Sequence, residues 1–197
     1  GTDVTGMLPQ WNNAGLFITG AGTVVGGSTA ADRNLISGNG TGLVLNSGSF
    51  ARGNWIGLDA TGAAALANGS GVSVQDATLG GTGAGEANTV SGNIGVGVTV
   101  YGSASLVQGN LIGTNPAGSA TVPNAGGGIG TFASGGTLGG PLPGAGNLVS
   151  GNGGNGILVS RDRDFGEIEV TLLRSFARGF SNALEDMWSA VTPIQVE

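Results

Sequence analysis

The feature that most constrains this chain is a hexapeptide that occurs three times. Asn-Leu-Ile-Ser-Gly-Asn begins at Asn34, and close copies begin at Asn88 (NTVSGN) and Asn147 (NLVSGN). A shorter form, Asn followed by one variable residue, Ile and Gly, begins at Asn54 and Asn110. Recurrence of one short apolar motif along the chain predicts a repeat architecture in which equivalent segments stack.

Each copy of the motif has the pattern of a short strand, in which side chains alternate between two sides. The second position accepts residues as different as Thr89 and Trp55, so we expect it to face outward. The third position is always Ile or Val, so we expect it to form one internal column: Ile36, Ile56, Val90, Ile112 and Val149.

The leading Asn of each motif points inward by the same parity. A buried amide is costly unless it is hydrogen-bonded. Amides stacked at the strand spacing of roughly 4.8 Å bond to one another. The sequence therefore predicts an asparagine ladder formed by Asn34, Asn54, Asn88, Asn110 and Asn147.

A second strand type completes the repeat. It consists of Gly followed by apolar, variable and apolar residues, at 15–18, 42–45, 71–74, 97–100 and 156–159, with a degenerate copy at 128–131. The motif at Gly1 returns at Gly57 and Gly113, an interval of 56 residues that contains two coils. We therefore expect an all-β, parallel β-helix of about six coils, with three strands in each coil and about 20 residues in the shortest.

Insertions lengthen alternate corners of this predicted solenoid. Odd coils carry them at the second corner, at residues 27–33, 81–87 and 140–146. Even coils carry them at the third corner, at 58–69 and 114–125, and residues 2–13 match that loop before the first coil. Because inserts on a solenoid align on one face, each family is expected to recur every second coil, about 9.6 Å apart.

Composition excludes several classes. The 43 glycines keep no three-residue period, which excludes collagen, and 39% hydrophobic residues with a net charge of −6 argue against disorder. The acidic balance argues against nucleic acid as a partner, and no apolar run is long enough to span a membrane. Cys, His and Lys are all absent. We therefore predict no disulfide, no metal site and no cofactor.

The repeat stops near residue 160. Residues 161–197 hold 2 of the 43 glycines but 11 of the 18 charged residues, so we predict two regions, 1–160 and 161–197. The second is predicted to contain a strand at 164–170 and a helix from Thr171 to about Ala190, ended by Pro193. Its apolar stripe consists of Leu173, Phe176, Phe180, Leu184 and Met187.

We expect this stripe to cap the solenoid, because open coil ends aggregate and repeat arrays need distinct terminal units. The alternatives are self-association through the helix or through the open N-terminal coil.

The motifs NLISGN, RGNWIG, LDATG and LGG, in fixed order over residues 1–160, resemble the right-handed parallel β-helix repeats of large bacterial secreted and surface proteins, a pectate-lyase-like class. The resemblance implies a right-handed helix with three sheets, an extracellular or cell-surface location, and a structural or adhesive role without a conserved active site. Residues 161–197 do not match it, so they are a native cap or a foreign segment, and an engineered capped scaffold remains an alternative. Because the chain begins within a motif, we expect it to be a piece of a longer protein.

Polysaccharide lyase or hydrolase activity is the main enzymatic alternative. Such lyases need a basic residue and carboxylates for Ca²⁺, and residues 1–160 contain only Arg33 and Arg52 as cations. Asp3 and Asp59 occupy equivalent loop positions, roughly 9–10 Å apart, near the upper spacing for an inverting carboxylate pair. The third equivalent is Asn115, which favours a turn-forming role. We therefore treat these two Asp residues as weak candidate acids and predict no enzyme activity.

Binding is the remaining function class. The predicted outward positions of the Gly-led strands are too mixed for an ice-binding face: Phe17, Val44, Ser73, Thr99, Gly130 and Leu158. The apolar residues among them, with Trp11 and Trp55, would form a strip for a glycan or protein ligand, unless the Trp side chains pack against insert loops. The leading hypothesis is a non-catalytic structural or adhesive solenoid, and the second is a carbohydrate-binding or polysaccharide-degrading protein.

Overall fold

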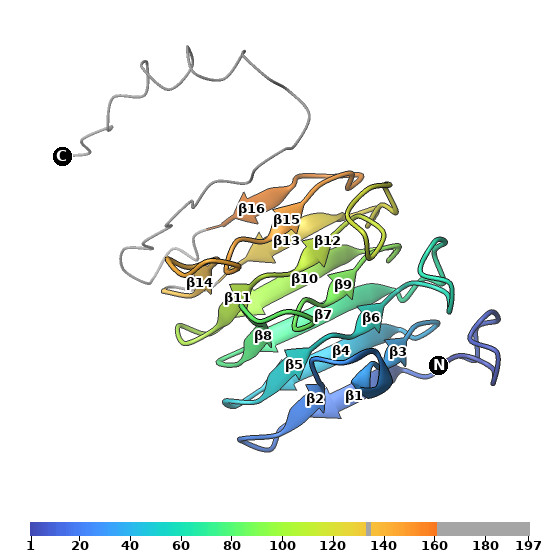
Figure 1. The fold of residues 1–197 in the computed structure, drawn as a ribbon, viewed down its shortest axis with the longest axis horizontal. Coiled ribbons are helices and arrows are strands. Elements are labelled where there is room, and N and C mark those ends of the chain that lie inside the picture. The colour runs from blue at the N-terminus through green and yellow to red at the C-terminus, as the bar shows by residue number, and fades with distance from the viewer. Residues whose placement is uncertain (133–134, 161–197) are drawn as a thin grey trace, which may run out of the picture.

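In the computed structural model, which describes residues 1–132 and 135–160, the chain forms a parallel β-solenoid with three sheets (Figure 1). Each coil adds one strand to each sheet, and every strand pairs in parallel with its equivalent in the next coil. The expected all-β fold is thereby confirmed. The right-handed sense of the coil stays a prediction from the bias of parallel crossovers.

The first sheet consists of the Gly-led strands. It contains β1 (Ala14–Ile18), β4 (Thr41–Asn46), β7 (Ser70–Gln75), β10 (Val96–Tyr101), β13 (Gly127–Thr131) and β16 (Ile157–Val159). The second contains β2 (Val24–Gly26), β5 (Phe50–Arg52), β8 (Thr78–Gly80), β11 (Leu106–Gln108) and β14 (Thr137–Leu138). The third, Asn-led sheet contains β3 (Leu35–Ile36), β6 (Trp55–Ile56), β9 (Thr89–Val90), β12 (Leu111–Ile112) and β15 (Leu148–Val149).

The described residues thus form five complete coils and the first strand of a sixth, where about six coils were expected. The second strand predicted for the sixth coil, at 164–170, lies outside the described residues. So does the predicted helical cap with its stripe of Leu173, Phe176, Phe180, Leu184 and Met187.

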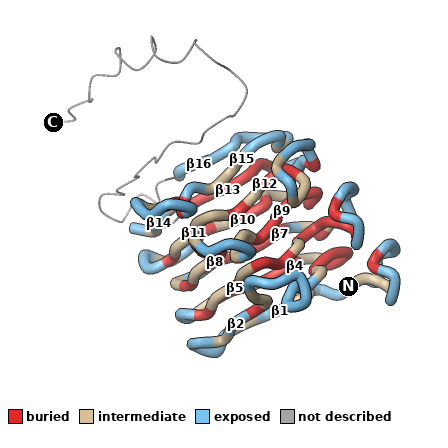
Figure 2. The backbone as a smooth tube through the Cα atoms, in the orientation of Figure 1, coloured by how far each residue is buried: buried red, intermediate tan, exposed pale blue. Residues whose placement is uncertain are grey.

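The core is built from columns of apolar side chains. Figure 2 shows the buried residues in red along the strands of the inner coils. The predicted Ile/Val column of the third sheet is confirmed, because Ile36, Ile56, Val90 and Ile112 are buried and Val149 packs against the core at the end. The variable second positions face outward and are half-buried, with one exception. Thr89 is buried because it lies in register between the larger Trp55 and Leu111.

The predicted asparagine ladder is present. The Nδ2 of each Asn donates to the Oδ1 of its equivalent in the next coil, at 2.9 Å for Asn34–Asn54, 3.0 Å for Asn54–Asn88, 3.0 Å for Asn88–Asn110 and 3.1 Å for Asn110–Asn147. The same Nδ2 also donates to a carbonyl of the preceding coil, as Asn88 does to Ala51 O at 2.8 Å. The inner amides are therefore fully used, which is what burial requires.

A second ladder, which the sequence analysis missed, lies at the corner before the first sheet. It runs through Asn12, Asn39, Asn68, Asn93, Asn124 and Asn152, with Nδ2–Oδ1 distances of 2.8–3.1 Å. The hexapeptide supplies Asn39, Asn93 and Asn152 as its last residue, whereas the other members end the third-corner inserts. The signal that would have found them is an Asn three or four residues before each Gly-led strand.

The ladders force the backbone of neighbouring coils close together at the corners. Gly80 shows the consequence: its φ is 89°, and a Cβ there would lie 2.0 Å from Gln108 O and 2.6 Å from Asn110 Oδ1. Only glycine combines this left-handed conformation with such an approach.

We predict that Asn88→Ala destabilises the protein more than Asn34→Ala. Asn88 pairs with Asn54 and Asn110 on either side and with Ala51 O, whereas Asn34 at the first coil donates only to Asn54. Each buried group left without a partner costs about 1–3 kcal/mol. Denaturant unfolding of both variants tests this, and equal stabilities of the two variants and the wild type would refute the ladder's contribution.

We also predict that Gly80→Ala destabilises far more than the matched change Gly22→Ala. Both glycines have positive φ, so both variants bear the strain of a left-handed alanine, about 1–2 kcal/mol. A Cβ at Gly22 would meet nothing within 4 Å, so the difference between the variants isolates the coil-to-coil clash at Gly80. Thermal unfolding midpoints measure it, and equal midpoints would contradict the close approach.

Candidate functional site

The third-corner inserts form a stack of short loops along one edge of the solenoid. Each closes with one antiparallel bridge: Thr2–Pro9, Leu58–Ala65 and Thr114–Thr121. Successive loops touch, since Ala60 N donates to Gly6 O at 3.0 Å and a Cβ at Gly62 would lie 2.9 Å from Pro116. The predicted recurrence of this insert family on every second coil is therefore confirmed.

The two candidate acids, Asp3 and Asp59, sit at the same point of these loops and hold the turns closed. Asp59 Oδ1 accepts hydrogen bonds from Thr61 Oγ1 at 2.7 Å and Thr61 N at 3.1 Å. Asp3 accepts from Thr5 Oγ1 at 2.8 Å and Leu8 N at 3.1 Å. In the third loop Asn115 Oδ1 accepts from backbone N–H groups in the same manner. The turn-forming role expected from Asn115 is thus present in all three loops.

These hydrogen bonds also set the acidity of the carboxyls. The Thr5 hydroxyl and the backbone N–H groups beside it lower the pKa of Asp3 from its usual value. Burial acts to raise the pKa of Asp59, but the hydrogen bonds from Thr61 and Ala64 outweigh it, so this pKa is also lowered. Both side chains are therefore carboxylates at neutral pH.

The second-corner inserts form a parallel stack. Gly85 lies against Ser28, and Gly144 against Thr82, so this family also recurs on every second coil.

The two arginines of the described residues, Arg33 and Arg52, lie beside these loops. Arg52 Nη1 binds Glu86 Oε1 at 2.9 Å, and its guanidinium lies 5.4 Å from the Phe50 ring.

Trp55 is engaged rather than open to a ligand. The guanidinium of Arg33 lies 4.1 Å from the centre of the Trp55 ring. The insert loop packs at Gly62 against the outer edge of the ring, where a Cβ would lie 2.9 Å from Trp55 Cη2. The alternative in which this Trp packs against an insert loop is therefore confirmed. Trp11, by contrast, is 71% exposed.

The outward face of the first sheet carries the expected mixed column of Phe17, Val44, Ser73, Thr99, Gly130 and Leu158, which the strand register places side by side. Next to it lies an aromatic pair that the sequence analysis missed. Tyr101 and Phe132 stack with ring centroids 5.8 Å apart and planes inclined by 20°. They are 43% and 45% exposed. The signal was their equivalent position in successive coils, directly after the paired residues Val100 and Thr131.

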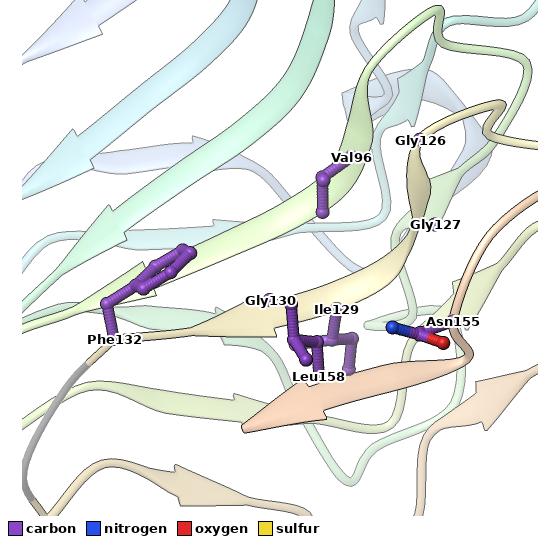
Figure 3. Close-up of a pocket in the computed structure, with 8 residues that line it drawn as sticks. All are labelled: Val96, Gly126, Gly127, Ile129, Gly130, Phe132, Asn155 and Leu158. Carbon is purple, nitrogen blue, oxygen red and sulfur yellow. The ribbon is translucent and has the colours of Figure 1, made fainter. Parts of the chain in front are cut away.

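A small hollow of about 50 Å³ adjoins this pair. It exists because Gly130 contributes no side chain to the outward column. Figure 3 shows the residues around it, and its lining is apolar except for the Asn155 amide: Val96, Gly126, Gly127, Ile129, Gly130, Phe132, Asn155 and Leu158. An apolar hollow with an exposed aromatic ring and one amide suits a small, weakly polar ring.

Comparison with known proteins returns no match to a family model, a curated protein or a solved structure. Within residues 1–132 and 135–160, no group of three or more acidic side chains converges to hold a metal ion. The same residues contain no helix of the length and apolarity needed to cross a bilayer.

We predict that Asp59→Asn keeps most of the stability at neutral pH, whereas Asp59→Ala loses about 1 kcal/mol or more, because Asn115 shows that an amide oxygen closes this turn. The pKa of Asp59 is lower in the folded state than in the unfolded state. Its carboxylate therefore stabilises the folded state at a pH above the unfolded pKa, and this stabilisation is lost as the pH falls through the folded pKa. Unfolding measured between neutral and acidic pH tests both statements. An Asp59→Asn variant with the wild-type acid sensitivity would contradict the second.

Proposed function

We propose that this solenoid is a non-catalytic structural or adhesive segment of an extracellular or cell-surface protein. The observation that supports it best is the continuity of the two asparagine ladders, each of which spans every complete coil. A column of paired amides fixes the stacking of each coil on the next and so makes a stiff rod, which suits a spacer or a display surface. The location rests on the resemblance of the repeat motifs to those of secreted and surface proteins.

The chemistry of the candidate acids agrees with this proposal. A glycosidase needs one carboxyl with a raised pKa to protonate the leaving oxygen. Both Asp3 and Asp59 have a lowered pKa, and hydrogen bonds from their own loops occupy them. The equivalent residue in the third loop is Asn115, whose amide cannot act as an acid. These observations favour a role in the turn over a role in bond cleavage.

A second candidate function, glycan binding, is favoured by the Tyr101–Phe132 pair. Aromatic faces exposed beside an apolar hollow are suited to the C–H face of a sugar ring. The Asn155 amide, at the opposite end of the hollow from Phe132 (Figure 3), supplies a donor and an acceptor for hydroxyl groups. The hollow admits only part of a sugar, so this site would bind one ring edge with low affinity.

One set of measurements separates these functions. We expect no cleavage of pectin, alginate or other acidic polysaccharides, and no signal on a glycan array. Turnover that Asp59→Asn abolishes would replace the proposal by the enzymatic alternative. Array binding that Phe132→Ala abolishes would establish the second candidate. Phe17→Ala is the matched control, because Phe17 is also an exposed ring on the first sheet but lies at its opposite end.

A further inference from the structure

The C-terminal end of the described solenoid leaves its apolar interior open. Ile157 and Val159 continue the inward columns that contain Leu43 and Leu45. The two Leu side chains are 0% exposed, whereas Ile157 and Val159 are 38% and 40% exposed, and β16 stands out as an exposed strand in Figure 2. Each inner coil is covered by the next coil, whereas within the described residues no layer covers the last one.

The polar groups at this end are also incomplete. Every inner Asn of a ladder donates one Nδ2 proton to a carbonyl and the other to the next coil. Asn147 Nδ2 donates to Val107 O, and Asn152 Nδ2 donates to Ile112 O and, at 3.4 Å, to Ser150 O of its own coil. Within the described residues, no next coil accepts the ladder bond from either amide. In addition, the three sheets end at β16, β14 and β15, so three strand edges are unpaired in the described part.

The opposite end of the solenoid is more closed. Leu16 and Ile18, which begin the same two columns in the first coil, are half-buried rather than exposed. Val25 and Ile36 of that coil are only 7% and 4% exposed, and Asn12 in the preceding insert extends the second ladder to the end. The two ends therefore differ: what the C-terminal end lacks is an apolar cover that also brings hydrogen-bond acceptors.

We propose that residues 161–197 of the same chain dock on this end and supply both. They follow Ser160 directly, so they start beside β16, and their 37 residues exceed the roughly 20 needed for one coil. Their first nine residues contain four carboxylates, which would accept the ladder bonds that Asn147 and Asn152 make to no described residue: Asp162, Asp164, Glu167 and Glu169. The apolar stripe then meets the open columns: Leu173, Phe176, Phe180, Leu184 and Met187.

The test uses the full chain and amide hydrogen exchange. The double variant F176D/F180D places two carboxylates on the stripe, and the control S175D/N182D places two carboxylates on the same segment but off the stripe. We expect the stripe variant to accelerate exchange of the β16 amides by roughly tenfold or more, whereas the control leaves it unchanged. The amides of β7, in the middle of the first sheet, report whether the solenoid itself stays folded.

Two results would overturn the proposal. In the first, the β16 amides of the wild type exchange as fast as those of an exposed loop such as residues 20–22. This measurement needs no variant, so it decides the question even if the variants unfold. The second is β16 protection that depends on protein concentration, together with a dimer or larger oligomer by light scattering. That result would make a second copy of the chain, not its own C-terminal segment, the cover of the open end.

Discussion

The whole structure depends on the pairing of amides inside the solenoid. A buried Asn without partners is costly, and one Asn alone in an apolar core has none. Stacking coils in register gives each amide a donor below and an acceptor above, so the cost is removed only when many coils stack together. Asn54 and Asn88 illustrate this, since each bonds to the ladder on both sides and to a backbone carbonyl. The ladder therefore specifies register as well as stability, because a shifted coil would leave these amides unpaired.

Close stacking of the amides explains why the sequence contains so much glycine. The corners that hold the ladders bring one backbone against the next, and a side chain at Gly80 or Gly57 would collide with a carbonyl of the next coil. The same close approach occurs within the inserts, since a Cβ at Gly85 would lie 1.9 Å from Ser28 O. Because the inserts alternate between two corners, each has the height of two coils. Each loop fills that height by contacting the next insert at the same corner, as Gly62 does with Pro116.

Sequence periodicity was sufficient for the features that repeat strictly. The inward column with Ile56 and Val90 and the ladder through Asn88 follow from parity along a strand, because a period of two fixes the side on which a residue lies. The second ladder was missed because Asn68 and Asn124 lie near the ends of inserts, whose length breaks the spacing to the hexapeptide. Tyr101 and Phe132 directly follow the aligned Gly-led motifs at 97–100 and 128–131, so their pairing was available from the repeat but lay one residue beyond the motif that was compared.

The ladders also give the solenoid a direction, and that direction makes its two ends chemically different. All amide bonds in both ladders run from Nδ2 of one coil to Oδ1 of the next, so the N-terminal end presents oxygen atoms and the C-terminal end presents N–H groups. Apolar surface alone would attract any apolar cover at either end. The additional demand for acceptors at Asn147 and Asn152 distinguishes a segment rich in carboxylates from one that is merely apolar. A solenoid of this kind can therefore select its cover by polarity, even though the driving force for covering the open columns is hydrophobic.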